Sequence, residues 1–216
     1  MANTLSNRSE IRTRPVTPRA AGSLVLVRQV ATGPEVLLGR RAGRHRFMPD
    51  VFVFPGGRLD TEDRNVEPIR PLPATTLAQV TRHTDEITAR ALAVAAVRET
   101  FEETGLALGR QESHGFRPDL GDIEYLGRAI TPSRNPIRFH ARFFLTRVGN
   151  GAGTLGGSGE LLDLDWYPIE AALKLPIVDV TEFMLSEVAA HLGPEGPRRR
   201  LPIFGYFRGK MRIRRE

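Results

Sequence analysis

The stretch "RETFEETG", residues 98–105, gathers three carboxylates within five positions. Glu99, Glu102 and Glu103 are spaced as i, i+3 and i+4, which places all three on one face of a helix, and Arg98 is the only cation beside them. The stretch is therefore either a solvated acidic face, with Arg98 paired to Glu102, or a site for Mg²⁺ or Mn²⁺, since these ions prefer oxygen ligands. Repulsion between exposed carboxylates costs only about 0.2–0.5 kcal/mol per pair, so it does not decide between the two interpretations.

The pattern around this stretch mixes strands and helices. Strands are expected at residues 22–30, 36–41, 50–57, 122–130, 137–148, 160–169 and 204–213. One helix is expected over residues 87–104, closed by Gly105 as a left-handed C-cap, and another over residues 181–192. A shorter helix is expected after Pro73, and six glycines in residues 149–159 predict a flexible loop. These elements predict one α/β domain with helices on both faces of a mixed sheet.

The composition excludes several classes of protein. The 216 residues include no cysteine, which rules out disulfides, thiolate metal sites and a cysteine nucleophile. The longest nearly apolar run, residues 89–97, is too short to span a membrane and contains Arg90. We therefore expect a cytoplasmic protein that binds no membrane.

The net charge of +6 is distributed unevenly along the chain. Residues 1–20 hold four Arg and one Glu, and residues 198–216 hold eight basic residues and one Glu, which leaves residues 21–197 with a negative balance. The first segment is expected to be a flexible basic tail. The basic C-terminal end either binds an anionic partner or forms a solubilising end strand. No RNA-binding motif accompanies it, so nucleic acid is not the expected partner.

A second motif stands upstream of the glutamates. Gly56 and Gly57 end a predicted strand in "FPGG" (54–57), and "AAVRETFEETGL" (95–106) follows. Together they resemble the Nudix box, G-x5-E-x7-R-E-U-x-E-E-x-G-U, in which U is an aliphatic residue. The second half matches except at Thr100, which replaces an aliphatic residue. On these motifs the chain is identified as a member of the Nudix hydrolase family.

The first half of the box departs from the family pattern. The position of its first Glu is taken by Asp63 when counted forward from Gly57, and by Arg90 when counted back from Arg98. Between Asp63 and Arg98 lie 34 residues, many more than the pattern allows, which indicates an insertion at about residues 64–86. An insertion inside the box is typical of a Nudix branch that includes acyl-CoA diphosphatases. The insertion could cap the cleft or contribute to a homodimer.

The resemblance implies a Nudix α/β/α sandwich with a mixed β-sheet over residues 21–216. It also implies that the protein uses Mg²⁺ or Mn²⁺ to cleave the diphosphate bond of a small-molecule nucleoside diphosphate derivative. The metal ligands that it implies are Gly57, Glu99, Glu102 and Glu103. Arg98 is expected to orient the glutamates. Glu160, beside the glycine-rich loop, is either a further catalytic carboxylate or an ordinary strand-edge acid.

Five arginines are candidates for binding the substrate phosphates. They are Arg41, Arg46, Arg58, Arg138 and Arg142. Strand alternation puts Arg138 and Arg142 on one face together with His140. This basic face either contacts phosphate or is simply solvated.

A stretch upstream of the glycine pair bears on the substrate. Residues 37–57, "LLGRRAGRHRFMPDVFVFPGG", are similar to the motif of coenzyme A diphosphatases, although Gly39 and Asp50 depart from it. Arg41 and Arg46 could contact the additional phosphate of coenzyme A. Coenzyme A or acyl-CoA is therefore one expected substrate. ADP-ribose, dinucleotides and capped RNA are alternatives, and so is a catalytically inactive ligand-binding module, against which the intact glutamates argue.

Overall fold

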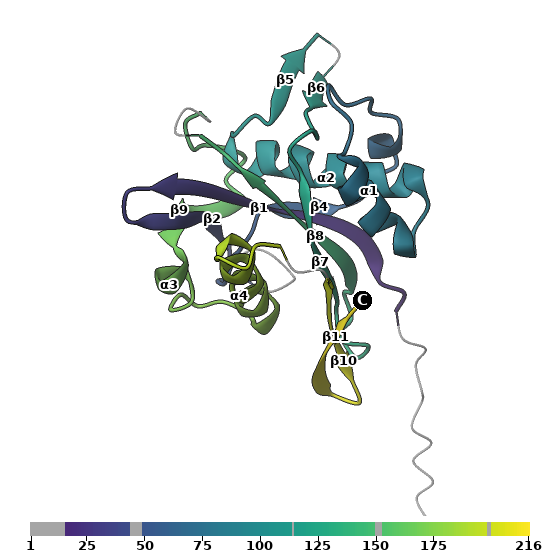
Figure 1. Cartoon of the computed structure of the whole chain (residues 1–216), viewed down its shortest axis with the longest axis vertical. Helices are drawn as coiled ribbons and strands as arrows, with labels where there is room; N and C mark the ends of the chain where they lie inside the picture. The colour runs from purple at the N-terminus through teal and green to yellow at the C-terminus, as the bar shows by residue number, and fades with distance from the viewer. Residues whose placement is uncertain (1–15, 44–48, 114, 150–152, 198–199) are drawn as a thin grey trace, which may run out of the picture.

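The centre of the molecule is a nine-stranded mixed sheet (Figure 1). The computed structural model describes residues 16–43, 49–113, 115–149, 153–197 and 200–216. The strands of the sheet are β1 (Arg19–Val30), β2 (Gly33–Arg41), β3 (Phe52–Val53), β4 (Gly56–Arg58), β7 (Glu124–Ile130), β8 (Phe139–Arg147), β9 (Leu161–Pro168), β10 (Pro202–Phe207) and β11 (Lys210–Arg215). Their order across the sheet is β11-β10-β7-β8-β1-β2-β3, with β4 paired to β1 and β9 paired to β2.

Two parallel pairings make the sheet mixed, as predicted. β1 runs parallel to β8 in a register that joins Arg19 to Phe139 and Val27 to Arg147, and β10 runs parallel to β7. The other pairs in the sheet are antiparallel. Because β1 and β8 are parallel, their first residues lie side by side at the same end of the sheet.

Helices cover both faces of the sheet (Figure 1). They are α1 (Ala74–Val80), α2 (Glu86–Thr104), α3 (Ile169–Ala172) and α4 (Asp179–Leu192). Leu24 and Leu26 of β1 share one hydrophobic core with α1 and α2, whereas Val25 and Val27 share the other with α3 and α4. Alternate side chains of one strand therefore supply both cores. The predicted α/β/α sandwich is confirmed.

Local sequence determines where α2 begins and ends and how closely it packs on the sheet. Asp85 accepts a hydrogen bond from the Thr88 N–H at 2.8 Å, and Gly105 ends the helix with a φ of 75°. The predicted start is correct within one residue. The helix packs so closely on β1 that a Cβ atom at Gly22 would lie 2.2 Å from the carbonyl oxygen of Leu92. Glycine at position 22 therefore sets the distance between the carboxylate helix and the sheet.

The segment between Asp63 and α2 does not extend this helix. It begins within the short helix η1 (Glu62–Arg64), and it contains α1 and the short helix η2 (Thr81–His83). Pro68, Pro71 and Pro73 lie in the irregular chain between η1 and α1, where the missing N–H of proline costs no helical hydrogen bond. Residues 64–85 thus form a partly helical excursion outside α2, and only Glu86 of the expected segment 64–86 belongs to that helix.

Two predicted strands are corrected by the structure. Pro55 divides residues 50–57 into β3 and β4, because proline has no N–H to donate to a strand ladder, and β4 then pairs with β1. Residues 204–213 form parts of two strands, β10 and β11, and not a single one. The chain turns between them at Arg208 and Gly209, both of which have positive φ.

A small hairpin was missed by the sequence analysis. β5 (Gly109–Glu112) and β6 (Gly115–Pro118) form a separate two-stranded sheet, and Phe116 stacks on Phe101 of α2 with ring centroids 4.5 Å apart.

β1 begins at Arg19, inside the segment expected to be a tail, of which residues 1–15 lie outside the described ranges. None of the helices in the described ranges has the length and apolar character needed to cross a membrane.

The glycine-rich loop is held in place over its described residues, 153–159. The N–H groups of Gly156 and Ser158 donate hydrogen bonds to the Thr104 and Glu102 carbonyl oxygens, both at 2.8 Å. These carbonyl oxygens belong to the last turn of α2, where carbonyl groups have no hydrogen-bond partner within the helix. Over these residues the predicted loop is present, and it caps the carboxylate helix.

Candidate active site

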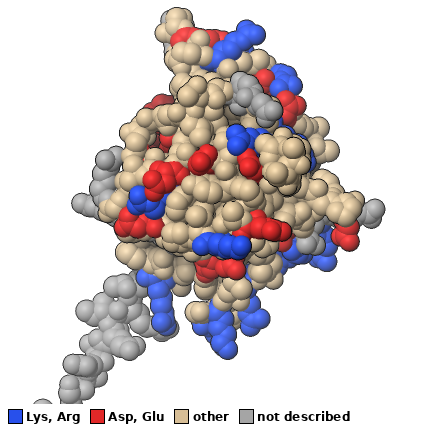
Figure 2. Space-filling model, turned by 90° about the vertical axis from the view of Figure 1, so that its left-hand side faces the viewer, with Lys and Arg blue, Asp and Glu red and all other residues tan. Residues whose placement is uncertain are grey.

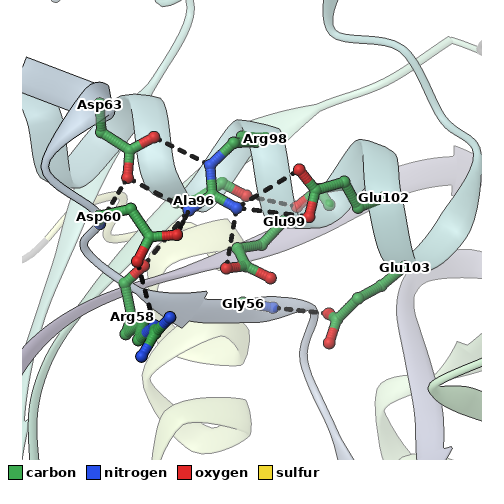
Figure 3. A network of polar contacts seen from close by, with 10 residues as sticks. Gly56, Arg58, Asp60, Asp63, Ala96, Arg98, Glu99, Glu102 and Glu103 are labelled. Atoms are coloured by element: carbon green, nitrogen blue, oxygen red, sulfur yellow. Dashed lines mark hydrogen bonds and ion pairs between the residues drawn. The ribbon is translucent and has the colours of Figure 1, made fainter. Parts of the chain in front are cut away.

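Arg98 is the centre of an ion-pair cluster on α2 (Figure 3). Its guanidinium lies 3.3 Å from Glu102, the predicted i,i+4 partner, and 3.0 Å from Glu99. It also donates two hydrogen bonds to Asp63, at 2.9 Å from Nε and 3.1 Å from Nη2. A planar fork of this kind fixes the orientation of both side chains. Arg98 therefore connects the glutamates of α2 to the loop that follows β4.

Asp63 occupies the position of the first glutamate of the Nudix box pattern when residues are counted forward from Gly57. Its side chain is 2% exposed and accepts a hydrogen bond from the Asp60 N–H at 2.8 Å in addition to those from Arg98. Arg90, the residue counted backward, contacts Glu67 at 3.3 Å instead. The partner of Arg98 at this box position is thus Asp63 and not Arg90.

The glycine pair of β4 lies directly against two glutamates of α2. The Gly56 N–H donates a hydrogen bond to Oε2 of Glu103 at 2.9 Å (Figure 3). A Cβ atom at Gly57 would lie 2.2 Å from Cδ of Glu99. Any side chain at position 57 would therefore displace that carboxylate.

Burial makes the charged form of Glu103 unfavourable. The residue is 5% exposed, and burial raises its pKa to about 8 against the opposing effect of the Gly56 N–H. The charges of Glu99 and Glu160 raise this pKa further, whereas Arg41 lowers it. Burial also raises the pKa of Glu99, although Arg98 opposes the shift. The arginines of the protein therefore neutralise these carboxylates only in part.

A cavity of about 340 Å³ opens beside the carboxylates. Glu99 and Glu103 of α2 and Glu160, directly before β9, all line it, together with Gly56 and Gly57. The rest of its wall comes from β1, the end of β2, the segment from β3 to β4, β7, β8, β10 and the start of α4. Glu160 reaches the cavity because the preceding loop is fastened to the end of α2.

Two of the predicted arginines, Arg41 and Arg58, line this cavity. Arg58 is largely exposed and pairs with Asp60 at 3.0 Å. Arg41, the last residue of β2, lines the cavity, whereas the neighbouring Arg40 pairs with Asp50 and Asp163. Arg46 lies outside the described residues.

Arg138 and Arg142 are absent from the described residues that line the cavity. β8 instead presents Phe139, Ala141 and Phe143 to it. The predicted alternation is confirmed within β8, but the apolar side borders the cavity and Arg142 lies on the opposite face of the strand. There Arg142 is 5% exposed, because α1 and α2 cover that face of the sheet. Arg138 precedes β8 and donates hydrogen bonds to the carbonyl oxygens of Thr131 and Val16.

Arg19 and the C-terminal hairpin also contribute to the site, although neither was predicted from the sequence. Arg19, the first residue of β1, lines the cavity, and so do Phe204 and Tyr206 of β10. Arg19 is brought there by the parallel pairing of β1 with β8, which no local pattern reveals. The alternation of Phe204 and Tyr206 was a readable signal of an apolar strand face.

The donor chemistry fits a divalent cation, although the carboxylates do not surround one point. Within the part of the chain that the structure describes, no three acidic or imidazole groups are close enough to enclose an ion. Arg98 holds Glu102 at a position where its side chain is 51% exposed, and Glu102 does not line the cavity. Glu103 is a buried and Glu99 a half-buried oxygen donor, both with raised pKa values, and a nearby divalent charge would favour their ionised form.

Comparison with known proteins places this arrangement in a family. No protein-family model matches the chain. The chain is 30% identical to a NUDIX hydrolase from Alicyclobacillus acidocaldarius, whose crystal structure matches with a TM-score of 0.65 over 83% of this chain and 94% of that one. The chain belongs to the Nudix hydrolase family. The second half of its Nudix box lies on α2, and the glutamates of the box are candidates for catalytic residues.

Two further likenesses of this Nudix chain are more distant. The NUDIX domain of Shewanella oneidensis NrtR, solved in complex with ADP ribose, has a TM-score of 0.54 at 16% identity over 82% of this chain and 90% of that one, and it shares the fold. A Caenorhabditis elegans protein that carries the name nudix hydrolase 7 is 25% identical over 173 residues. That match includes 68% of this chain and 50% of the relative, so the chain spans about half the length of this curated relative.

Proposed function

We propose that this Nudix chain is a hydrolase that cleaves the diphosphate bond of a nucleoside diphosphate derivative with Mg²⁺ or Mn²⁺. The observation that carries the proposal is one cavity lined by Glu99, Glu103 and Glu160 and also by Arg41 and Arg58. A diphosphate is anionic, so a site that attacks it needs cations against the phosphate oxygens and carboxylates to hold or activate the reacting groups. Both kinds of side chain line this cavity.

The glutamates of the box would hold the cation. Glu99 and Glu103 would supply carboxylate oxygens, Glu102 would join them by a change of side-chain position, and Gly57 would add its carbonyl oxygen. The chemistry that a bound divalent cation supplies is neutralisation of the phosphoryl oxygens and polarisation of the phosphorus atom. Arg98 contacts Glu99 and Glu102 and would keep their carboxylates oriented.

Other side chains of the cavity would bind substrate and move a proton. Arg41 and Arg58 would contact the diphosphate through charge-assisted hydrogen bonds. Glu160 would accept the proton of the attacking water, since its carboxylate lines the cavity directly before β9. The water oxygen would then bond to phosphorus while the other phosphate leaves with the bridging oxygen.

Among diphosphates, coenzyme A and its acyl derivatives remain our preferred substrate class. Support comes from the similarity of residues 37–57 to the motif of coenzyme A diphosphatases and from the position of Arg41 in the cavity. ADP-ribose is the second candidate, since a NUDIX domain of the same fold was solved with that ligand.

The proposal is tested by a screen for diphosphate cleavage in the presence of Mg²⁺ or Mn²⁺. Coenzyme A, acetyl-CoA, ADP-ribose, a dinucleoside polyphosphate and capped RNA would each be incubated with the protein, and the products identified by mass spectrometry. We expect metal-dependent cleavage between the two phosphorus atoms of at least one compound. Binding without cleavage of any of them would favour an inactive ligand-binding module.

A further inference from the structure

The C-terminal hairpin has two chemically different faces. Antiparallel pairing joins Phe204 to Ile213 and Tyr206 to Met211, so these four side chains lie on one face. The opposite face carries basic residues, which are Lys210, Arg212 and Arg214. Figure 2 shows Lys and Arg side chains gathered at the lower end of the molecule, where Figure 1 places this hairpin.

The apolar face of the hairpin begins inside the cavity and continues into solvent. Phe204 and Tyr206 line the cavity, and Phe204 is covered by Phe183 of α4 at a centroid distance of 5.2 Å. Met211 and Ile213, on the neighbouring strand, are 52% and 42% exposed. Two large apolar side chains thus extend the aromatic wall of the cavity onto the surface, where exposed apolar residues in continuity with a pocket mark a binding region.

The size of the cavity indicates that a substrate would extend beyond it. Its volume of about 340 Å³ lies near the lower end of the ~300–1,000 Å³ found for ligand sites. The carboxylates and Arg41 provide the polar wall for the diphosphate, and β8 and β10 provide an apolar wall. A group that leaves the cavity along β10 would meet Met211 and Ile213 next.

We propose that Tyr206, Met211 and Ile213 form a specificity strip that binds an apolar arm attached to the diphosphate of the substrate. This inference rests on the proposed function, since the arm reaches the strip only when the diphosphate occupies the cavity. The strip is continuous with the cavity through the Tyr206–Met211 pair, which favours a part of the substrate over a separate partner as its occupant.

The test compares two substrates that differ only in the arm, ethyl-ADP and octyl-ADP. The rates are measured as kcat/KM in the presence of Mg²⁺. The concentration of octyl-ADP is kept below the value at which it forms micelles. Because each buried methylene strengthens apolar binding, wild-type protein should prefer octyl-ADP by about tenfold or more. Met211→Asp and Ile213→Asp should each reduce this preference to about threefold or less, whereas Met211→Leu should retain it.

Phe207 provides a matched control on the same hairpin. It is 61% exposed and pairs with Lys210 on the opposite face, so Phe207→Asp should keep the chain-length preference. Thermal denaturation of each variant shows whether the hairpin is still folded. Equal rates on both substrates in the wild-type protein would overturn the strip while leaving the diphosphatase intact. No cleavage of either compound would overturn the proposed function and the strip with it. If the wild-type protein is a dimer and Met211→Asp dissociates it, the strip is an interface between copies. This outcome would also overturn the inference.

Discussion

Arg98 and Asp63 are joined by two parallel hydrogen bonds of 2.9 and 3.1 Å although 34 residues separate them in sequence. Asp63 is almost fully buried, and Arg98 also contacts two glutamates of the box. Burial lowers the pKa of Arg98, but the hydrogen bond to Asp63 and the carboxylates around it raise this pKa overall. The pair therefore fixes the carboxylates of α2 relative to the loop that follows β4.

Loss of the Asp63 carboxylate should disturb both stability and metal use. Asp63→Asn removes the charge that the Arg98 fork contacts, and a weakened buried hydrogen bond of this kind lowers the free energy of unfolding by roughly 1–3 kcal/mol. Residues that orient metal ligands typically change metal affinity or activity by about 10- to 100-fold. We expect the Mg²⁺ concentration for half-maximal activity to rise by that order. Arg90→Gln is the control and should leave it unchanged, since Arg90 contacts Glu67 outside the cluster.

Gly57→Ala should inactivate the protein through a steric conflict. The added Cβ would lie 2.2 Å from Cδ of Glu99, so the carboxylate must move away from the cavity. A shift of a reacting group by about 1 Å can cost roughly 10²-fold in rate, and we expect a loss of this order in kcat. Gly149→Ala is the matched control, because nothing lies within 4 Å of a Cβ at that position. Similar activity in both variants would contradict the close packing of Gly57 on Glu99.

The preference for coenzyme A should depend on Arg41. Dephospho-coenzyme A lacks the 3′-phosphate, and loss of one charge-assisted contact of about 1.5–3 kcal/mol lowers kcat/KM by roughly 10- to 150-fold. Arg41→Ala should remove this difference between the two compounds, whereas Arg40→Ala, a residue paired with Asp163 and Asp50, should retain it. If the wild-type protein cleaves both compounds equally, coenzyme A is not recognised through its extra phosphate.

Mild acid should destabilise the protein partly through His140. Burial lowers the pKa of His140 to about 3, and the charges of Arg142, Arg128 and His83 act in the same direction. An unfolded histidine has a pKa of about 6.5, so between pH 6.5 and 3 the unfolded chain binds more protons at this position. The stabilisation is therefore complete above pH 6.5 and is lost as the pH falls.

Comparison of two proteins isolates this contribution. The raised pKa of Glu103 acts in the opposite direction below pH 8, but it is common to wild type and His140→Gln. Urea unfolding at pH 7 and pH 5 should show a larger loss of stability in wild type than in His140→Gln. The amide oxygen of the introduced glutamine could still accept the hydrogen bond that Arg128 directs at the imidazole ring. Equal pH dependence of the two proteins would mean that folding does not lower the pKa of His140.

Much of the fold could be predicted because its determinants are local. Gly105 ends α2 by adopting a left-handed conformation, and the alternation of β1 provides apolar residues for two cores. The division at Pro55 was also readable from its missing N–H. The turn at Arg208 and Gly209 was harder to predict, because Arg208 adopts a positive φ that arginine rarely takes.

The candidate site was only partly predictable because its assembly is non-local. Alternation separated Arg142 from Phe143 correctly, but which side of β8 borders the cavity depends on the helices that cover each face. Likewise, sequence spacing offered Asp63 and Arg90 as alternatives for one role. The choice between them follows from the path of residues 64–85, which no local pattern determines.

The most direct test of the diphosphatase proposal is metal-dependent cleavage by wild type and Glu103→Gln. The substitution keeps the size of a residue that is 5% exposed but removes its charge, and Glu86→Gln on the first turn of the same helix is the control. With coenzyme A or ADP-ribose as substrate, we expect wild type and Glu86→Gln to require Mg²⁺ or Mn²⁺. Glu103→Gln should be slower by roughly 10²–10³, the effect of one charge-stabilising group. Cleavage that persists without divalent cations, or a folded Glu103→Gln variant with wild-type turnover, would contradict the proposal.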